Sequence, residues 1–298
     1  MSTYSIKDLE MLSGIKAHTL RIWEQRYALL NPKRTETNIR YYDDADLKLI
    51  LNVALLNENG LKISKIAAMN LEEIRTEVMR LTERSLAHDD QIHALTIAMV
   101  EMNEERFEKI LNSNIIKLGF EQTMLHVIYP FLSKIGILWQ TAAINPAQEH
   151  FISNLIRQKL IVAIDGQMIS GDGKKFLLFL PEGELHEISL LFTTYLIKSF
   201  GHKVIYLGQS TPMSDLISVY ELHHPEYLLT VATTTPAMES VQSYVDELGG
   251  LFPDSTVLVS GFQVISQDLV LPHNVQQLTQ LRDIKPILEQ ISQVLQEK

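Results

Sequence analysis

The sequence predicts a chain of three parts: a small helical region with a β-hairpin, an all-helical bundle, and an α/β domain built on a doubly wound parallel sheet. Two short helical patterns joined by a glycine turn open the first part, at about 1–75. Helical patterns alone fill the second part, at about 76–168. Five short apolar runs alternate with helical stretches in the third part, 170–298, which is typical of a βαβ series.

The composition is that of an ordinary folded protein. Its 298 residues suggest two or three domains, and a hydrophobic content of 46% is ample for their cores. No stretch of 18 apolar residues predicts a membrane span, and the polar first residues do not resemble a signal peptide. The absence of cysteine excludes disulfides, thiolate nucleophiles and cysteine-based metal sites. We therefore expect a cytoplasmic protein with no membrane partner.

The charge is unevenly distributed along the chain. The net charge is −10, yet residues 1–70 hold ten basic and eight acidic side chains, a net of +2, so that the remainder carries −12. Six bases and only two acids lie within 16–40. A basic patch on an otherwise acidic protein is the pattern expected of a nucleic-acid-binding surface.

The first part has the pattern of a helix-turn-helix. Ser5 is a candidate N-cap for a first helix, and Gly14 permits a tight turn after it. A second helix is predicted over 16–30, with its apolar side chains on one face and polar and basic ones elsewhere. The apolar positions of the two helices are Ile6, Leu9, Leu12 and Ile15, then Leu20, Trp23 and Tyr27.

The stretch "NPKRTETNIRYYDD", residues 31–44, predicts a small β-hairpin. It holds a proline, a basic pair and Asn38, which suits a turn that needs a positive φ. Asp43 or Asp44 is expected to cap a further helix that runs to about Asn59, with Gly60 ending it. A helix-turn-helix followed by such a hairpin predicts a winged DNA-binding domain.

This first segment, from "YSIKDLEMLSGIKAHTLRIWEQRY" to "RYY", resembles the DNA-binding domain of MerR-type transcription regulators over about 70 residues. It departs in the wing, where Asn38-Ile39 stands in place of the usual Gly-Tyr. The resemblance implies binding to double-stranded promoter or operator DNA by a homodimer or a higher oligomer. The implied DNA-binding residues are Lys16, His18, Thr19, Arg21, Arg26, Arg34, Arg40 and Tyr41.

The second part predicts four or five helices with short links, near 71–84, 90–102, 104–118 and 120–140, and a last one from 146. The start of the last helix is well marked, because Asn145 can act as N-cap, Pro146 suits the first helical position and Gln148 the third. Such helices pack as a bundle. A bundle that serves only for dimerisation or as a spacer is the alternative.

The third part predicts strands at 176–180, 203–207, 227–231 and 256–259, with a weaker one near 275–278, after a linker marked by Gly171 and Gly173. His186 follows the first strand, in "GELHEIS". A lone histidine is most often a satisfied surface or core residue. The alternative is a ligand site, because open α/β sheets bind ligands at the carboxyl ends of their strands.

This part resembles the cobalamin-binding domain of corrinoid methyltransferases and mutases. The matching elements are Glu184-Leu185-His186, then Thr230-Val231-Ala232, then Ser260-Gly261. The resemblance implies a Rossmann-like cobalamin-binding fold, with His186 as the lower axial ligand of cobalt and Glu184 orienting it. It also implies that Ser189, Thr230, Ser260 and Gly261 line the pocket of the nucleotide tail, although Ser189 and Ser260 stand where the family has glycines.

The helical part carries a further match. Trp139 is followed, after nine residues, by Glu149-His150. This spacing resembles that of the light-sensing MerR-type repressors of carotenoid genes, in which a helical bundle caps the upper face of cobalamin. The resemblance implies that Trp139, Glu149 and His150 shield the upper ligand, and that adenosylcobalamin is the form bound.

We expect a transcription regulator, not an enzyme, whose C-terminal half senses a corrinoid, with light as a further input, and changes its oligomeric state. A regulator that has lost cobalamin and works through protein contacts is one alternative, and a corrinoid methyl carrier is another. Two weaker candidates remain. His223-His224 are expected to be exposed, and Thr233-Thr234-Thr235 are expected either to bind a ligand's polar edge or to cap the next helix.

Overall fold

The computed structural model describes residues 4–35, 38–84, 88–140, 144–168, 173–234 and 240–296. The chain forms two compact units, Met1–Leu155 and Ile156–Lys298. The division falls inside helix α10, Pro146–Asp165, and the three domain ranges expected from the sequence stay a prediction. Gly171, Thr235 and the side chain of Trp139 lie outside the described residues.

The helix-turn-helix is present as predicted. Helix α1 is Ile6–Ser13, and Ser5 caps it through a reciprocal pair of hydrogen bonds with Asp8. Gly14 has φ 76°, and its N–H closes the turn on a carbonyl of α1. Helix α2 is Ala17–Tyr27. It ends three residues earlier than predicted, because Ala28 adopts a left-handed conformation (φ 51°) and turns the chain.

The wing consists of β1, Lys33–Arg34, paired antiparallel with β2, Arg40–Tyr41. Asn38 has φ 62°, as predicted for its turn. Asp43 caps helix α3, Asp44–Glu58, and accepts hydrogen bonds from two of its first amides. A short helix that the sequence pattern did not predict, α4, covers Ile63–Ile66.

The remaining helices of the first unit are α5, α6 and α7, at Leu71–Arg84, His88–Val100 and Glu104–Leu118. The predicted helix over 120–140 is instead interrupted: α8, Phe120–Thr123, and α9, Tyr129–Gln140, flank a π-helical turn, Met124–Ile128. Helix α10 begins as predicted, because Asn145 accepts from the Ala147 amide at 2.9 Å and Gln148 accepts from the Asn145 amide at 3.0 Å. No helix within the described ranges is both long and apolar enough to cross a membrane.

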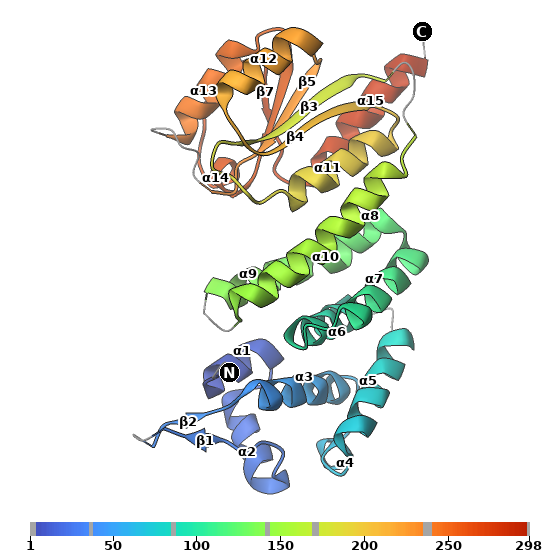
Figure 1. Cartoon of the computed structure of the whole chain (residues 1–298), viewed down its shortest axis with the longest axis vertical. Coiled ribbons are helices and arrows are strands. Elements are labelled where there is room, and N and C mark those ends of the chain that lie inside the picture. Colours follow the sequence, from blue (N-terminus) through green and yellow to red (C-terminus); the bar gives the residue numbers. More distant parts are fainter. Residues whose placement is uncertain are drawn as a thin grey trace. The chain divides into compact units, whose positions relative to one another are not determined.

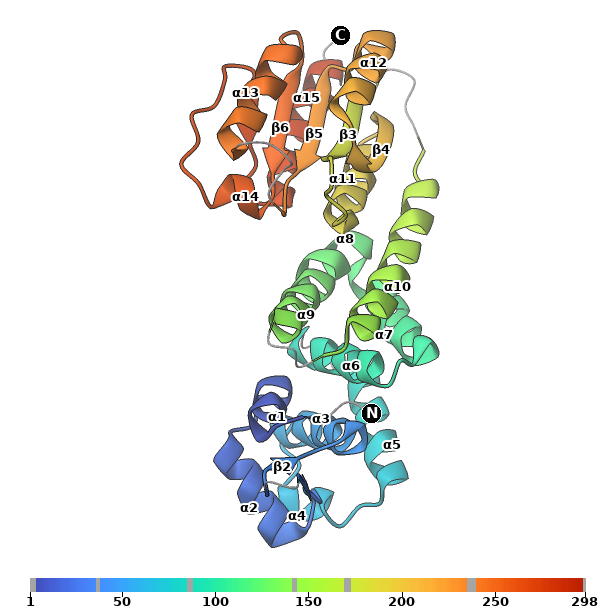
Figure 2. The same ribbon diagram turned by 60° about the vertical axis from the view of Figure 1, so that its left-hand side comes forward.

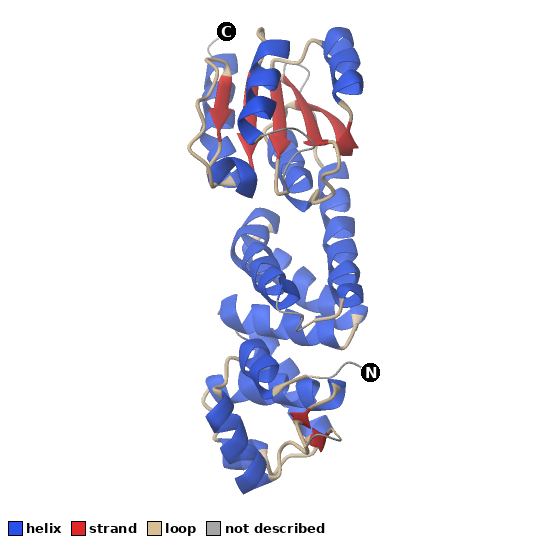
Figure 3. Cartoon of the chain, turned by 90° about the vertical axis from the view of Figure 1, so that its left-hand side faces the viewer, coloured by secondary structure: helices blue, strands red, loops and turns tan. Residues whose placement is uncertain are grey.

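The second unit is a five-stranded parallel sheet (Figure 3). Its strands are β3 Lys175–Pro181, β4 Lys203–Thr211, β5 Tyr227–Val231, β6 Thr256–Ser260 and β7 Val275–Gln277. The order β4-β3-β5-β6-β7 means that the chain leaves β3 toward one edge and returns to β5 on its other side. The carboxyl ends of β3 and β5 therefore form a topological switch point, where open α/β sheets bind ligands.

Helices cover both faces of this sheet (Figures 1 and 2). Helices α12, Met213–His223, and α13, Val241–Leu251, pack on one face, where side chains of β3, β5 and β6 form a continuous buried core with them. Helices α11, Ile188–Ser199, and α15, Ile284–Gln296, lie together on the other. A short helix, α14, covers Phe262–Ile265 directly after β6, and one 3-10 turn, Leu281–Asp283, precedes α15.

Protonation of His93 in α6 is expected to destabilise the first unit at low pH. Burial, assisted by the charge of Lys134, lowers the pKa of His93 to about 4, against the opposing effect of Asp90. The unfolded chain, with a histidine pKa of about 6.5, then binds the proton more readily. Stability present above pH 6.5 is therefore lost as the pH falls toward 4, by up to about 1.4 kcal/mol per pH unit.

Thermal unfolding of the wild type and of His93→Gln, measured between pH 7.5 and 5, checks this. The substitution should flatten the dependence of the unfolding midpoint on pH. The exposed His223, at the end of α12, supplies the control substitution His223→Gln. Parallel curves for the wild type and His93→Gln would contradict the assignment.

Candidate functional site

A buried carboxylate organises the switch point. Glu184, in the loop after β3, is 2% exposed and accepts hydrogen bonds on both oxygens. Its Oε1 accepts from the amides of Leu185 and His186, each at 2.9 Å, and lies 2.6 Å from His186 Nδ1. Its Oε2 accepts from the Thr233 amide at 2.9 Å and from the amide and hydroxyl of Thr234 at 2.6 and 2.9 Å. One side chain thus ties the loop after β3 to the loop after β5.

The ionisation of Glu184 fixes the tautomer of His186. Burial alone would raise the pKa of Glu184, but the hydrogen bonds from His186 and Thr234 outweigh it and hold the pKa well below its usual range. Glu184 is therefore an acceptor at neutral pH, and His186 Nδ1 must carry the proton. In the neutral ring, Nε2 is then the nitrogen with a lone pair suited to a metal ion. The His186 side chain is 63% exposed, while its partner is almost fully buried.

A second buried acid, Glu187, anchors the same loop. The Tyr206 hydroxyl of β4 donates to its Oε2 at 2.9 Å, and Arg157 Nε of α10 lies 2.5 Å from Oε1 as an ion pair, without the angle of a hydrogen bond. Burial, and next the charge of Glu187, raise the pKa of Tyr206. Sequence reasoning missed Glu187, although an acid directly after a candidate ligand histidine is the signal that points to it.

The threonines after β5 do not cap the next helix, which was one of the two roles expected for them. Thr233 and Thr234 donate to Glu184, and the other expected role, binding a ligand's polar edge, stays a prediction. Helix α13 is capped by Ser240, whose hydroxyl accepts from the Ser243 amide at 3.0 Å. Nothing local to the threonines indicates that they donate to a carboxylate some 50 residues earlier in the sequence.

The candidate tail residues lie near the carboxyl ends of the strands. Thr230 is 1% exposed, and its buried hydroxyl interacts with the buried hydroxyl of Tyr244 in α13. The Ser260 hydroxyl donates to the Leu278 carbonyl at 2.9 Å, so it is satisfied inside the sheet. Ser189 is half-buried in the first turn of α11.

Gly261 is required by the backbone. Its φ is 102°, and an added Cβ would lie 2.4 Å from the Ala232 carbonyl oxygen. Cobalamin-binding domains are expected to carry a Gly-Gly pair at 260–261. Gly261 is the second position of that pair, and it has both the conformation and the close approach that only glycine permits. The first, Ser260, directs its hydroxyl to the neighbouring chain segment.

The three candidate cap residues lie in α9 and α10. Trp139 belongs to α9. Glu149 and His150 lie in the first turns of α10, where Glu149 Oε1 accepts from the Ser153 hydroxyl at 2.6 Å and Oε2 lies 3.0 Å from His150 Nδ1. The His150 side chain is 74% exposed. The Glu149–His150 pair is thus an exposed one, unlike the pair of His186 with the buried Glu184.

The candidate DNA-binding residues surround α2 and the wing. His18, Arg21 and Arg26 are exposed on α2 and Thr19 is half-buried, while Leu20 and Trp23 enter the core. Lys16 precedes the helix, 3.1 Å from Glu10 and with its side chain 72% exposed. The outward face of α2 is therefore polar and basic, as a helix that enters the major groove requires.

The two arginines of the wing, Arg34 and Arg40, each contact a polar side chain of the same domain. Arg34 donates to the Asn38 side-chain oxygen at 2.7 Å, across the wing turn. Arg40 lies 3.8 Å from Glu24, which also accepts from the Tyr42 hydroxyl at 3.1 Å. Tyr41 is half-buried in β2.

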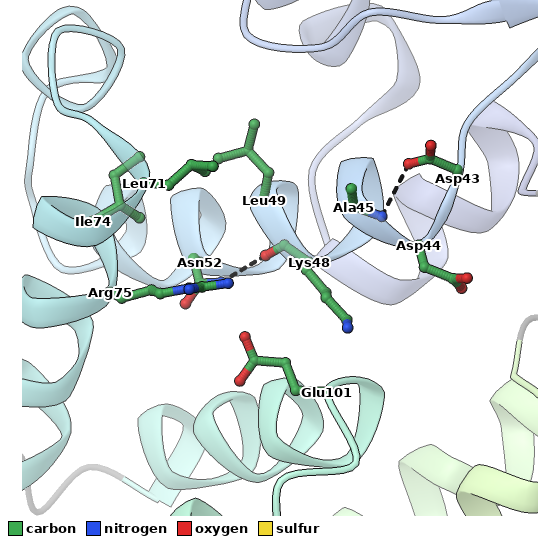
Figure 4. Close-up of a pocket in the computed structure, with 10 residues that line it drawn as sticks. All are labelled: Asp43, Asp44, Ala45, Lys48, Leu49, Asn52, Leu71, Ile74, Arg75 and Glu101. Atoms are coloured by element: carbon green, nitrogen blue, oxygen red, sulfur yellow. Dashed lines mark hydrogen bonds between the residues drawn. The ribbon is translucent and has the colours of Figure 1, made fainter.

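A hollow of about 380 Å³ also lies in the first unit, between α3, α5 and the end of α6 (Figure 4). Three acids and two bases are among the residues that line it, so its charge favours no single kind of ligand. Asn52, 4% exposed, donates to the Lys48 carbonyl at 2.6 Å, and its buried side-chain oxygen has no hydrogen bond from the part of the chain that the structure describes. The lining residues are Asp43, Asp44, Ala45, Lys48, Leu49, Asn52, Leu71, Ile74, Arg75 and Glu101.

Two family models match the chain. Residues 4–72 match the MerR HTH family regulatory protein, and residues 91–163 match the B12 binding domain. The chain combines a MerR-type helix-turn-helix with a B12-binding domain. The second match covers the helical region that contains Trp139, Glu149 and His150, and not the sheet.

Relatives and a solved structure agree with this domain composition. The chain is 27% identical over 252 residues to the HTH-type transcriptional repressor CarH of Myxococcus xanthus. The aligned region covers 83% of each protein. It is 29% identical over 256 residues to the repressor CarA of the same organism, covering 82% of each. The monomethylamine corrinoid protein of Methanosarcina barkeri superimposes with a TM-score of 0.54 at 15% identity, covering 68% of this chain and 99% of that one.

These matches agree on the make-up of the chain. The relatives are named as transcriptional repressors, and the match over residues 4–72 is to a family of regulatory proteins. The corrinoid protein shares its fold, which confirms the Rossmann-like cobalamin-binding architecture expected for the sheet.

Gly261→Ala should destabilise the second unit by about 2–4 kcal/mol, because it adds both backbone strain and a collision with the Ala232 main chain. Gly183 supplies a matched control: its φ is 82°, but nothing lies within 4 Å of an added Cβ. Gly183→Ala should therefore cost only the backbone term, about 1–2 kcal/mol. Chemical denaturation measures both, and equal losses would contradict the close approach at Gly261.

Proposed function

We propose that this regulator binds promoter DNA as a homodimer or a higher oligomer, and that its C-terminal half senses a corrinoid, with adenosylcobalamin as the bound form. The observation that carries the sensing proposal is the Glu184–His186 pair. An exposed imidazole whose Nδ1 is held at 2.6 Å by a buried carboxylate presents Nε2 as a preoriented metal ligand. Corrinoid binding in turn changes the oligomeric state, with light as a further input.

The chemistry of the site fits a corrinoid. When bound, the group supplies a cobalt ion that accepts a nitrogen ligand on one side. His186 would hold this ion through Nε2, and Glu184 would keep the ring in the required tautomer. The close approach at Gly261 supports a tail pocket lined by Ser189, Thr230, Ser260 and Gly261.

The residues proposed to shield the upper ligand are Trp139, Glu149 and His150. All three lie inside the 91–163 match to the B12 binding domain. The 3.0 Å approach of Glu149 Oε2 to His150 Nδ1 supports a role that needs an oriented imidazole. These assignments rest on the Trp-x9-Glu-His spacing and on that match.

A second candidate function is a regulator that works through protein contacts without cobalamin. The specific observation in its favour is Ser260, whose hydroxyl is satisfied by the Leu278 carbonyl with no ligand needed. A corrinoid methyl carrier would have no use for the helix-turn-helix at 4–72.

A titration of the purified protein with adenosylcobalamin in the dark tests the sensor proposal. The wild type should bind at micromolar concentration or below, and His186→Ala should bind more weakly with the absorption spectrum of a corrinoid that lacks its histidine ligand. His223→Ala, an exposed histidine of α12, is the control and should match the wild type. A wild type that binds no corrinoid would leave the protein-contact function in its place.

The DNA-binding proposal is tested by salt dependence. Removing one phosphate contact with Arg21→Ala should weaken binding to promoter DNA and reduce the slope of log affinity against log salt by about one unit. Arg282→Ala, an exposed arginine next to α15, should leave the slope unchanged. An identical slope in the wild type and Arg21→Ala would argue against a phosphate contact at Arg21, and an absence of any DNA binding would end the proposal.

A further inference from the structure

Ile22 is an exposed apolar side chain on the outward face of α2. It is 51% exposed. His18 and Arg26 lie one helical turn before and after it, and both are exposed, as are Arg21 and Gln25 beside it. The buried face of the helix is formed by other residues, so Ile22 contributes little to the core.

Single exposed apolar residues are common on proteins, so exposure alone assigns no role. The position does, because α2 is the second helix of the helix-turn-helix, the one that reads base edges in the major groove. Its exposed neighbours can donate or accept hydrogen bonds, whereas Ile22 can do neither. In the major groove, the C5-methyl group of thymine is the apolar feature that distinguishes one base pair from another.

We propose that Ile22 contacts the methyl group of one thymine in each half-site, and so specifies a T·A pair there. This inference rests on the proposed DNA binding. Isoleucine suits such a contact, because its branched side chain has one strongly preferred χ1 rotamer in a helix and loses little freedom on binding. The flanking His18 and Arg26 lie about 6 Å to either side along the helix, so their polar groups reach the neighbouring phosphates or bases.

The wing offers a matched comparison. Ile39, at 65% exposed, is the same residue type next to the wing turn. The wing is expected to contact the DNA backbone, which carries no sequence information. Ile39→Ala should therefore leave base preference unchanged, whereas Ile22→Ala should relax it at one position.

The experiment uses the full-length protein and sites selected from a pool of random double-stranded DNA. Each thymine of the selected site is then replaced in turn by deoxyuridine, which removes only the methyl group. At one thymine of a half-site the replacement should weaken wild-type binding about fourfold, the effect expected of one buried methyl group. Ile22→Ala should bind the thymine and uridine versions equally, while Ile22→Val, which keeps a branched side chain, should retain most of the discrimination.

The outcomes separate this inference from the proposed function. If the wild type selects a site, and every uridine replacement affects the wild type and Ile22→Ala alike, the thymine contact is wrong and DNA binding stands. If Ile39→Ala, and not Ile22→Ala, removes the discrimination, the contact belongs to the wing and the inference is overturned. If no site is selected, both proposals fail together.

Discussion

The arrangement at the sheet depends on the burial of the Glu184 carboxylate. A buried carboxylate is costly unless hydrogen bonds satisfy both oxygens, and here each oxygen accepts two or more. Three of the bonds come from the loop after β3 and three from the loop after β5. Because the Glu184 carboxylate must be hydrogen-bonded, it joins two loops that are about 50 residues apart in the sequence. The same hydrogen bonds orient His186.

The strand order makes this possible. Because β3 lies between β4 and β5, the loop that carries Glu184 has neighbours on both sides. On the β5 side, Thr233 and Thr234 satisfy the carboxylate. On the β4 side, Tyr206 satisfies Glu187, and the Gln209 side chain donates to the Leu185 carbonyl at 2.7 Å. The loop around His186 is thus fixed by side chains of β4 on one side, and by two amides and a hydroxyl of the loop after β5 on the other. Rigid support of this kind is what a preorganised ligand requires.

Much of this could be predicted from the sequence, because local signals were strong. Apolar runs located all five strands, and caps at Ser5, Asp43 and Asn145 located three helix starts. What could not be predicted depends on contacts distant in sequence. The partners of Thr233 and Thr234 are one example, and the bond from the Ser260 hydroxyl to Leu278 is another. The π-helical turn at Met124–Ile128 comes just before Pro130, which has no N–H for the regular helical hydrogen bond. The single helix predicted over 120–140 leaves this signal out.

The same reasoning explains how an acidic protein can present a basic DNA-binding face. Acids near α2 and the wing are occupied within the fold: Asp8 caps α1, Asp43 caps α3, and Glu24 accepts from Tyr42. Their charges stabilise the backbone of the domain. Among the basic residues of the outward face, Lys16 pairs with Glu10 while its own side chain stays 72% exposed, and exposed ion pairs of this kind are worth little in water. Little free energy is therefore lost when these bases exchange such partners for phosphates, and the net charge of −10 does not decide the affinity of this local surface.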